Sequence, residues 1–106
     1  MALQLNDTNF QEILSNNSVV IVDFSATWCG PCKALSPIVD KIATTYEGRV
    51  AVCKMDIEES PETTEQFGIR SVPTVLFFKN GELVPNTKIV GMTQEAKLAA
   101  TIDGLL

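Results

Sequence analysis

The sequence predicts an α/β fold in which a central mixed β-sheet of four to five strands carries helices on both faces. A β-branched run at residues 19–25 is typical of a buried strand, and an apolar stripe with helical spacing runs from residue 31 towards Gly48. Asn80-Gly81 separates two further apolar runs, which is a strong hairpin signal. Strands joined by a helix run parallel and strands joined by a hairpin run antiparallel, so the sheet is mixed. The 106 residues suffice for a single domain, residues 1–106, and are too few for two.

The other elements follow from local patterns. Phe10, Ile13 and Leu14 are spaced i, i+3, i+4, which predicts a short amphipathic helix, and Thr8 and Gln11 are placed to form its capping box. The remaining elements are a strand at 50–57, a helix at 61–67, strands at 74–79 and 82–90, and a final helix that carries Leu98, Ile102 and Leu105.

Smaller features complete this outline. Ser60 precedes Pro61, so we expect Ser60 to cap the helix at 61–67. Pro85 has no N–H group to give to a ladder, so the strand at 82–90 is expected to lie at an edge or to bulge there. A short strand at Leu3–Leu5 would be the fifth strand.

Composition excludes several functions and indicates a compartment. Thirteen acidic against eight basic residues give a net charge of −5, which makes nucleic acid a poor candidate ligand. The chain has no histidine, so Ser-His and Cys-His catalysis, histidine metal ligands and a histidine pH switch are excluded. It has three cysteines and no secretory signal pattern at its start. We expect a soluble protein of a reducing compartment, the cytoplasm, and a mature organellar protein would look the same.

One motif carries chemistry: residues 28–33, with the sequence WCGPCK, follow the first strong strand and open the long helix. Cys29 and Cys32 are three residues apart, so their Cβ atoms lie about 5–6 Å apart on a helix, close enough for a disulfide. Cys29 sits at the helix N-terminus, where free N–H groups stabilise a thiolate and lower its pKa. Cys32 is one turn further in and is expected to be more buried. Pro31 suits the first helical position and stiffens the ring.

A metal site is the alternative for these cysteines. Structural zinc usually takes four Cys or His ligands, and only Cys53 remains, so we expect no bound metal. Cys53 lies in the middle of an apolar strand, where a cysteine is most often a small buried hydrophobic residue, with a regulatory thiol as the alternative.

Other short sequence blocks accompany this motif along the chain. Val22-Asp23-Phe24 precedes it, residues 68–74 (GIRSVPT) and 78–82 (FKNGE) follow, and Val90-Gly91 comes later. In this order and spacing the sequence resembles the thioredoxin family, with its thioredoxin fold, over nearly its whole length; a C-x-x-C motif near a βαβ pattern is itself a known mark of that fold.

The resemblance implies a thiol–disulfide oxidoreductase that reduces protein disulfides through a Cys29–Cys32 dithiol–disulfide cycle. Such a protein donates electrons and contributes to cell redox homeostasis. The sequence has no glycine-rich dinucleotide fingerprint, so we expect no bound cofactor, and a monomer is the default expectation. Its partners would be disulfide-containing proteins and a thioredoxin reductase that supplies electrons from NADPH, or a ferredoxin-linked equivalent, with no role for nucleic acid or a membrane. In this cycle Cys29 is the nucleophile and Cys32 the resolving thiol, with Gly30 and Pro31 contributing to the site.

The resemblance also assigns roles to two charged residues. Asp23 interrupts an apolar strand, so burial should raise its pKa, and in the family the matching carboxyl exchanges a proton with the resolving cysteine, here Cys32. The alternative is a buried aspartate with a structural partner. Lys54 would neighbour Asp23 and tune its titration, or else extend its ammonium to the surface.

A docking groove is implied as well. In the family the bond before the residue matching Pro73 is cis and lies against the disulfide, which leaves the backbone of Val72 free to pair with an extended substrate segment. Trp28 and Gly91 would line the same groove, since a residue without Cβ lets another chain approach closely. The alternative for Trp28 is packing in the core.

One departure and two rival functions stand beside this interpretation. Ser25 occupies a position where many thioredoxins carry Trp, which opens space near the site. An oxidase or isomerase of the same fold is one rival, but Gly30 and Pro31 place no charge between the cysteines to stabilise the thiolate. A non-catalytic binding subunit, in which only the groove matters, is the other.

Overall fold

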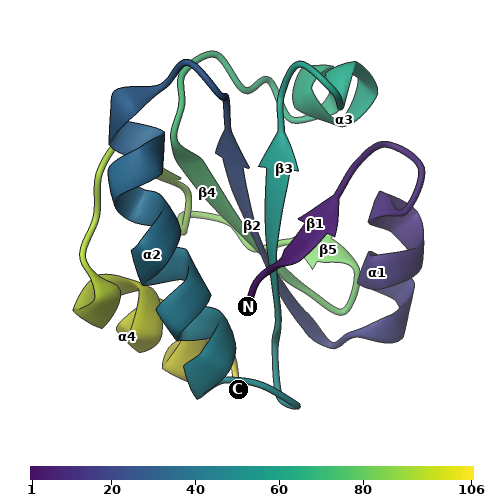
Figure 1. Ribbon diagram of the computed structural model, residues 1–106. Coiled ribbons are helices and arrows are strands. Elements are labelled where there is room, and N and C mark those ends of the chain that lie inside the picture. The colour runs from purple at the N-terminus through teal and green to yellow at the C-terminus, as the bar shows by residue number, and fades with distance from the viewer.

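The computed structural model describes residues 1–106 as a six-stranded sheet with four helices (Figure 1). The elements in chain order are β1 (Leu3–Leu5), α1 (Phe10–Asn16), β2 (Val19–Ser25), α2 (Gly30–Thr45), β3 (Ala51–Asp56), α3 (Pro61–Gln66), β4 (Thr74–Lys79), β5 (Glu82–Leu83), β6 (Ile89–Val90) and α4 (Glu95–Leu105). None of the helices is both long and apolar enough to cross a membrane.

The sheet is mixed, as the sequence predicts. Its order is β1-β3-β2-β4-β5, with β6 also paired to β4. Both pairs that involve β3 are parallel, and β4 runs antiparallel to β2, β5 and β6. The sheet exceeds the expected four to five strands because the segment 82–90 is two short strands instead of one. Pro85 lies in the loop between them, followed by Asn86 at a φ of 63°, so the ladder is interrupted there.

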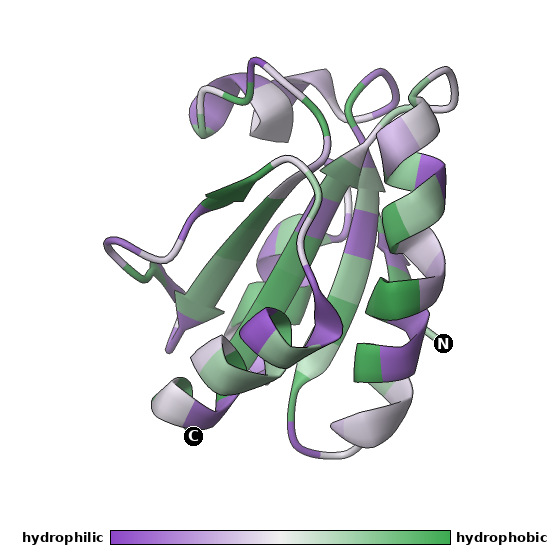
Figure 2. Cartoon of the chain, turned by 90° about the vertical axis from the view of Figure 1, so that its left-hand side faces the viewer, coloured by the Kyte–Doolittle hydropathy of each residue, from purple (hydrophilic) through white to green (hydrophobic).

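Alternation along the strands divides the core into two layers. Ile21 and Val52 face α2 and α4, whereas Val22 and Cys53 face α1 and α3. Figure 1 shows the same arrangement, with α2 and α4 on one side of the sheet and α1 and α3 on the other. In Figure 2 the strands are largely hydrophobic, while hydrophilic colour gathers in the loops and on the outer sides of the helices.

Helix α3 begins differently from the sequence prediction. The predicted cap, Ser60, is buried, and its Oγ has no hydrogen-bond partner. Asp7, from the loop after β1, takes this role instead by accepting from the backbone N–H groups of Glu62 (3.0 Å) and Thr63 (2.8 Å). A cap supplied from a distant part of the chain leaves no local sequence signal.

Helix α1 also lacks its predicted capping box. The residue before the helix is Asn9, and no side chain caps the first turn. The turn is held one step earlier, where Asn6 Oδ1 accepts from the backbone N–H groups of Thr8 (2.9 Å) and Asn9 (3.2 Å). Asparagine side chains organise turns in this way, which competes with capping by neighbouring residues.

Candidate active site

The two motif cysteines meet at the start of α2. Cys29 is the residue that caps the helix, Gly30 is its first residue and Pro31 its second. A disulfide joins Cys29 and Cys32, with their Cα atoms 5.3 Å apart. Cys29 Sγ accepts a hydrogen bond from the backbone N–H of Cys32 at 3.1 Å. The helix therefore directs a free N–H donor at the Cys29 sulfur, which favours negative charge there once the disulfide is reduced.

Exposure does not separate the two sulfurs. Cys29 is 5% exposed and Cys32 is 4% exposed, so the expectation that Cys32 is the more buried does not hold for the disulfide form. Their neighbours do differ. Cys29 Sγ lies 3.7 Å from the carbonyl oxygen of Val72, on the side of the loop before β4, whereas Cys32 lines a hollow together with Asp23.

The loop before β4 carries the predicted cis bond, between Val72 and Pro73. The carbonyl of Pro73 accepts from the N–H of Gly91 at 2.8 Å, which ties this loop to the end of β6. Gly91 has a φ of 89°, and a Cβ built on it would meet nothing within 4 Å. The space above Gly91 is therefore open to a visiting chain, and the backbone conformation itself favours glycine.

Three exposed apolar side chains lie next to Cys29 or Gly91 in the sequence. Trp28 is 65% exposed, so its side chain is not part of the core. Val90 and Met92, on either side of Gly91, are exposed too. Sequence reasoning did not single out Met92, although its position next to Gly91 is the signal that would have found it.

Asp23 lies beneath the motif on the α2 side of the sheet. It is 1% exposed, and its Oδ1 has no hydrogen-bond partner. Burial raises its pKa to about 7, against the opposing charge of Lys54, which stands opposite it in the β2–β3 register. Asp23 and Cys32 line one hollow of about 320 Å³. Its full lining is Asp23, Ser25, Ala26, Thr27, Cys32, Lys33, Ser36 and Lys54.

Ser25 borders this hollow and leaves it open. The small side chain stands at the end of β2, just before the loop that leads to Cys29. A large aromatic residue in its place would occupy space that is now free beside Asp23 and Cys32.

Lys54 is held by two groups that sequence reasoning missed. Its Nζ donates to Ser36 Oγ at 2.6 Å and forms an ion pair with Asp40 at 2.9 Å. The Lys54 side chain is only 20% exposed, so its ammonium does not extend freely into solvent, and its ion pair is with Asp40 and not with Asp23. Cys32, Ser36 and Asp40 are four residues apart along α2, and this spacing is the signal that places them on one stripe of the helix.

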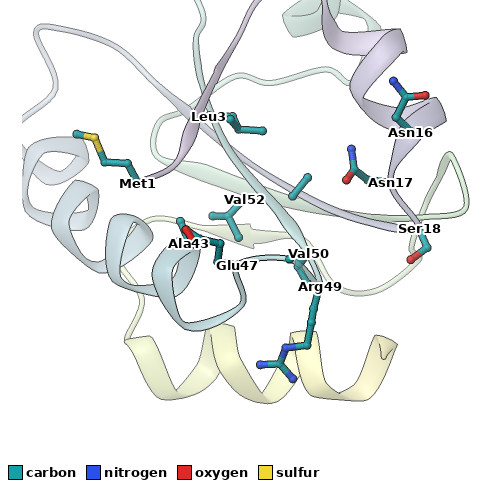
Figure 3. A pocket seen from close by; sticks show the side chains of 12 residues that line it. Met1, Leu3, Asn16, Asn17, Ser18, Ala43, Glu47, Arg49, Val50 and Val52 are labelled. Atoms are coloured by element: carbon teal, nitrogen blue, oxygen red, sulfur yellow. The ribbon is translucent and has the colours of Figure 1, made fainter.

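Cys53 stands apart from this chemistry. It is fully buried in the layer that faces α1 and α3, and burial raises the pKa of its thiol to about 12. No group of three or more Cys, Asp or Glu side chains is placed to hold a metal ion. A hollow of about 460 Å³ lies near the other ends of the strands, with Met1, Leu3, Asn17 and Arg49 around it (Figure 3), and none of the predicted site residues lines it.

Three features together define a class of protein. They are the cysteine pair that forms a disulfide at the start of α2, the loop with a cis-proline beside it and the buried carboxyl of Asp23. These features belong to a thiol–disulfide oxidoreductase, in which a dithiol and a disulfide interconvert at one site.

Comparison with known proteins gives the family. The thioredoxin family model matches residues 1–104. The chain is 48% identical over 104 residues to a thioredoxin of Rickettsia conorii, covering 97% of each chain. It is 43% identical to a thioredoxin of Synechocystis sp., covering 97% of this chain and 95% of that protein. The solved structure of a mutant thioredoxin from Halobacterium salinarum superposes with a TM-score of 0.88 at 35% identity, covering 98% of this chain and 89% of the other. The chain belongs to the thioredoxin family, and it is a thiol–disulfide oxidoreductase with protein-disulfide reductase activity.

Proposed function

We propose that Cys29 is the nucleophile and Cys32 the resolving thiol of this reductase. The Cys29 thiolate attacks one sulfur of a substrate disulfide, that disulfide breaks, and its leaving sulfur takes up a proton. Cys32 then loses its proton and attacks Cys29 Sγ, so the mixed disulfide breaks and the substrate's second sulfur leaves as a thiol. The substrate gains two electrons and two protons, and the Cys29–Cys32 disulfide remains. The N–H of Cys32 that points at Cys29 Sγ is the observation that carries this assignment.

Asp23 is proposed as the group that takes the proton from Cys32. Both residues line the same hollow, and a carboxyl with a pKa of about 7 is suited to proton exchange near neutral pH. The unpartnered Oδ1 leaves a lone pair free for this purpose. Lys54 is proposed to tune Asp23, since its charge opposes the effect of burial on the carboxyl.

Trp28, Val72, Pro73 and Gly91 are proposed as the substrate groove, to which Gly30 and Pro31 contribute through the shape of the disulfide ring. The exposed ring of Trp28 and the open space above Gly91 support this proposal. Proline gives no N–H beside the sulfurs, and the carbonyl oxygen of Val72 lies 3.7 Å from Cys29 Sγ, which supports the proposal that this backbone pairs with an extended substrate segment.

The electrons are proposed to come from NADPH through a thioredoxin reductase, or from a ferredoxin-linked reductase. The sequence has no glycine-rich dinucleotide fingerprint that would let the chain bind such a cofactor itself. The relatives include bacterial proteins and chloroplastic M-type thioredoxins of pea and spinach. We place this chain in the cytoplasm or in the interior of an organelle, as a monomer in which residues 1–106 act as one domain.

A trapping experiment tests the assignment of the two cysteines. Reduced Cys32→Ser protein is mixed with oxidised insulin and separated on a non-reducing gel. The variant lacks the resolving thiol, so we expect a stable mixed disulfide through Cys29, identified by peptide mass spectrometry. Cys53→Ala protein is the matched control: it should reduce insulin and trap nothing. If the Cys32→Ser variant forms no adduct, or forms one through Cys53, the proposed roles are wrong.

A further inference from the structure

The two facing charges in β2 and β3, a buried Asp23 and a half-buried Lys54, do not form an ion pair. Asp23 and Lys54 stand opposite each other on neighbouring parallel strands, with their side chains on the same face of the sheet. Neighbouring strands are about 4.8 Å apart, so a change of rotamer is enough to bring a flexible lysine side chain onto the adjacent carboxylate. In the structure Lys54 instead pairs with Asp40 and donates to Ser36, and Asp23 Oδ1 has no partner.

Helix α2 supplies both of the groups that hold Lys54. Ser36 and Asp40 are one turn apart on α2 and contact the Lys54 ammonium at 2.6 Å and 2.9 Å. Asp40 is fixed in turn, because its Oδ1 accepts from the backbone N–H of Ala2 at 3.2 Å. Hydrogen bonds from Lys54 and Ala2, together with the charge of Lys54, hold the pKa of Asp40 below its usual range, so Asp40 remains an anion near neutral pH.

We propose that Ser36 and Asp40 are positioning residues that hold the Lys54 ammonium off Asp23, so that the Asp23 carboxyl stays available for proton exchange. This proposal rests on the proposed function of Asp23. An ammonium in direct contact would stabilise the carboxylate and lower the pKa of Asp23 by roughly one to three units. With its pKa lowered in this way, the Asp23 carboxyl would stay ionised near neutral pH and would hold a proton poorly.

The surroundings of Asp23 leave few other groups to set its titration. Lys54 faces it from β3, and Cys32 and Lys33 line the same hollow from α2. The neighbour across β4 is Val75, which carries no charge. Two cations thus line the hollow, and of these Lys54 is the one whose charge lowers the pKa of Asp23.

The test is an NMR titration of the Asp23 carboxyl carbon in the oxidised protein. Asp40→Asn keeps an acceptor for the N–H of Ala2 and removes the anion that holds Lys54. We expect the Asp23 midpoint to fall by about one unit or more. Ser36→Ala removes a single hydroxyl and should shift the midpoint in the same direction by less. Glu95→Gln is the matched control. It removes a carboxylate of α4 that pairs with Lys41 of α2, the helix that carries Ser36 and Asp40, and it should leave the Asp23 midpoint unchanged.

A Lys54→Met background separates action through Lys54 from a direct effect of the lost charge. In that background Asp40→Asn should lose most of its effect on Asp23. The proposal is overturned if Asp40→Asn leaves the midpoint unchanged or raises it. It is equally overturned if the full decrease persists without Lys54. An NMR spectrum of each variant at a single pH checks that the variant is folded. If Asp40→Asn does not fold, Ser36→Ala is used for the test instead.

A second readout separates this proposal from the proposed function. The rate at which Cys32 resolves a mixed disulfide is measured against pH in wild-type and Asp40→Asn protein, and its midpoint should follow that of Asp23. If the Asp23 midpoint moves and the rate profile does not, the proton-transfer role of Asp23 fails while the positioning of Lys54 stands. If the Asp23 midpoint does not move, the positioning proposal fails whatever the rate does.

Discussion

Val22 and Asp23 are adjacent in β2 but face opposite layers of the core. Val22 stands opposite Cys53 in the layer under α1 and α3, and Asp23 stands opposite Lys54 in the layer under α2. The first layer is apolar at this level. At the same level the second layer has a polar residue, Asp23, whose Oδ1 has no hydrogen-bond partner and which lines the same hollow as Cys32.

The same contrast holds for two thiols of one chain. Cys53 and Cys29 are both buried, yet burial in an apolar layer raises the pKa of the Cys53 thiol to about 12, whereas Cys29 Sγ accepts an N–H bond at a helix start. We therefore expect the reactivity of each thiol to depend on its surroundings as well as on its burial. A reactive thiol needs a hydrogen-bond donor or a positive charge that stabilises its thiolate. Cys29 has such a donor at the start of α2.

The largest expected effect is on turnover. Cys29→Ser removes the proposed thiolate nucleophile, so insulin reduction in the presence of dithiothreitol should fall to the rate with dithiothreitol alone. Cys53→Ala, in the opposite layer, should keep the wild-type rate. Turbidity of precipitating insulin measures both variants. If Cys29→Ser retained activity, or if folded Cys53→Ala lost it, the claim that turnover depends on Cys29 and not on Cys53 would be wrong.

Stability should show the difference between the layers next. Burial raises the pKa of Asp23 to about 7 in the folded protein, from its ordinary value of 3.8, which applies to the unfolded chain. The folded state thus binds more protons at Asp23 between these values, so the contribution of Asp23 to stability falls as pH rises from about 4 to about 7. Asp23→Asn should be more stable than wild type by roughly 4 kcal/mol at pH 8.5 and by little at pH 4.

Urea unfolding of the oxidised proteins at the two pH values measures this difference. Leu76→Ala, from the layer under α1 and α3, is the comparison. It should cost about 3 kcal/mol at both pH values, since it leaves a cavity and no charge. An Asp23→Asn gain that is the same at both pH values would show that Asp23 does not titrate as described.

The resolving step should respond more moderately. Asp23→Asn removes the proposed proton acceptor for Cys32, so release of substrate from the mixed disulfide should slow by about ten- to a hundredfold at pH 7. At pH 9.5 hydroxide takes over and the difference should shrink. Stopped-flow measurements on a preformed adduct test this, and an unchanged rate at pH 7 would remove Asp23 from the mechanism.

The smallest effect concerns the groove. Gly91→Ala and Gly48→Ala both put a side chain on a backbone of positive φ, at 89° and 83°, so each should cost about 1 kcal/mol of stability. Of the two, only Gly91 belongs to the proposed substrate groove, so only its variant should raise the KM for a protein disulfide, by a few-fold. A KM raised equally by Gly48→Ala would mean that strain, not contact, causes the change.

Local patterns predicted most of the fold and part of the site. The motif at 28–33, the parallel unit and the hairpin at Asn80-Gly81 all depend on residues close in sequence, and the structure confirms them. The resemblance to a family supplied the cis bond at Pro73, which no local pattern indicates.

What the sequence did not predict depends on contacts between distant segments. Asp7 caps a helix more than fifty residues away, and Lys54 is held by Ser36 and Asp40 across the space between β3 and α2. The equal burial of Cys29 and Cys32 was missed for another reason: position along a helix does not say what the neighbouring loop covers.

Alkylation of the fully reduced protein with iodoacetamide across pH tests most directly whether surroundings, and not exposure, set thiol reactivity. Each cysteine is followed by peptide mass spectrometry. We predict that Cys29 reacts fastest, with a midpoint below the ordinary value of about 8.5, and that Cys53 stays unlabelled until the protein unfolds. Equal rates for Cys29 and Cys32, both with ordinary midpoints, would contradict the account.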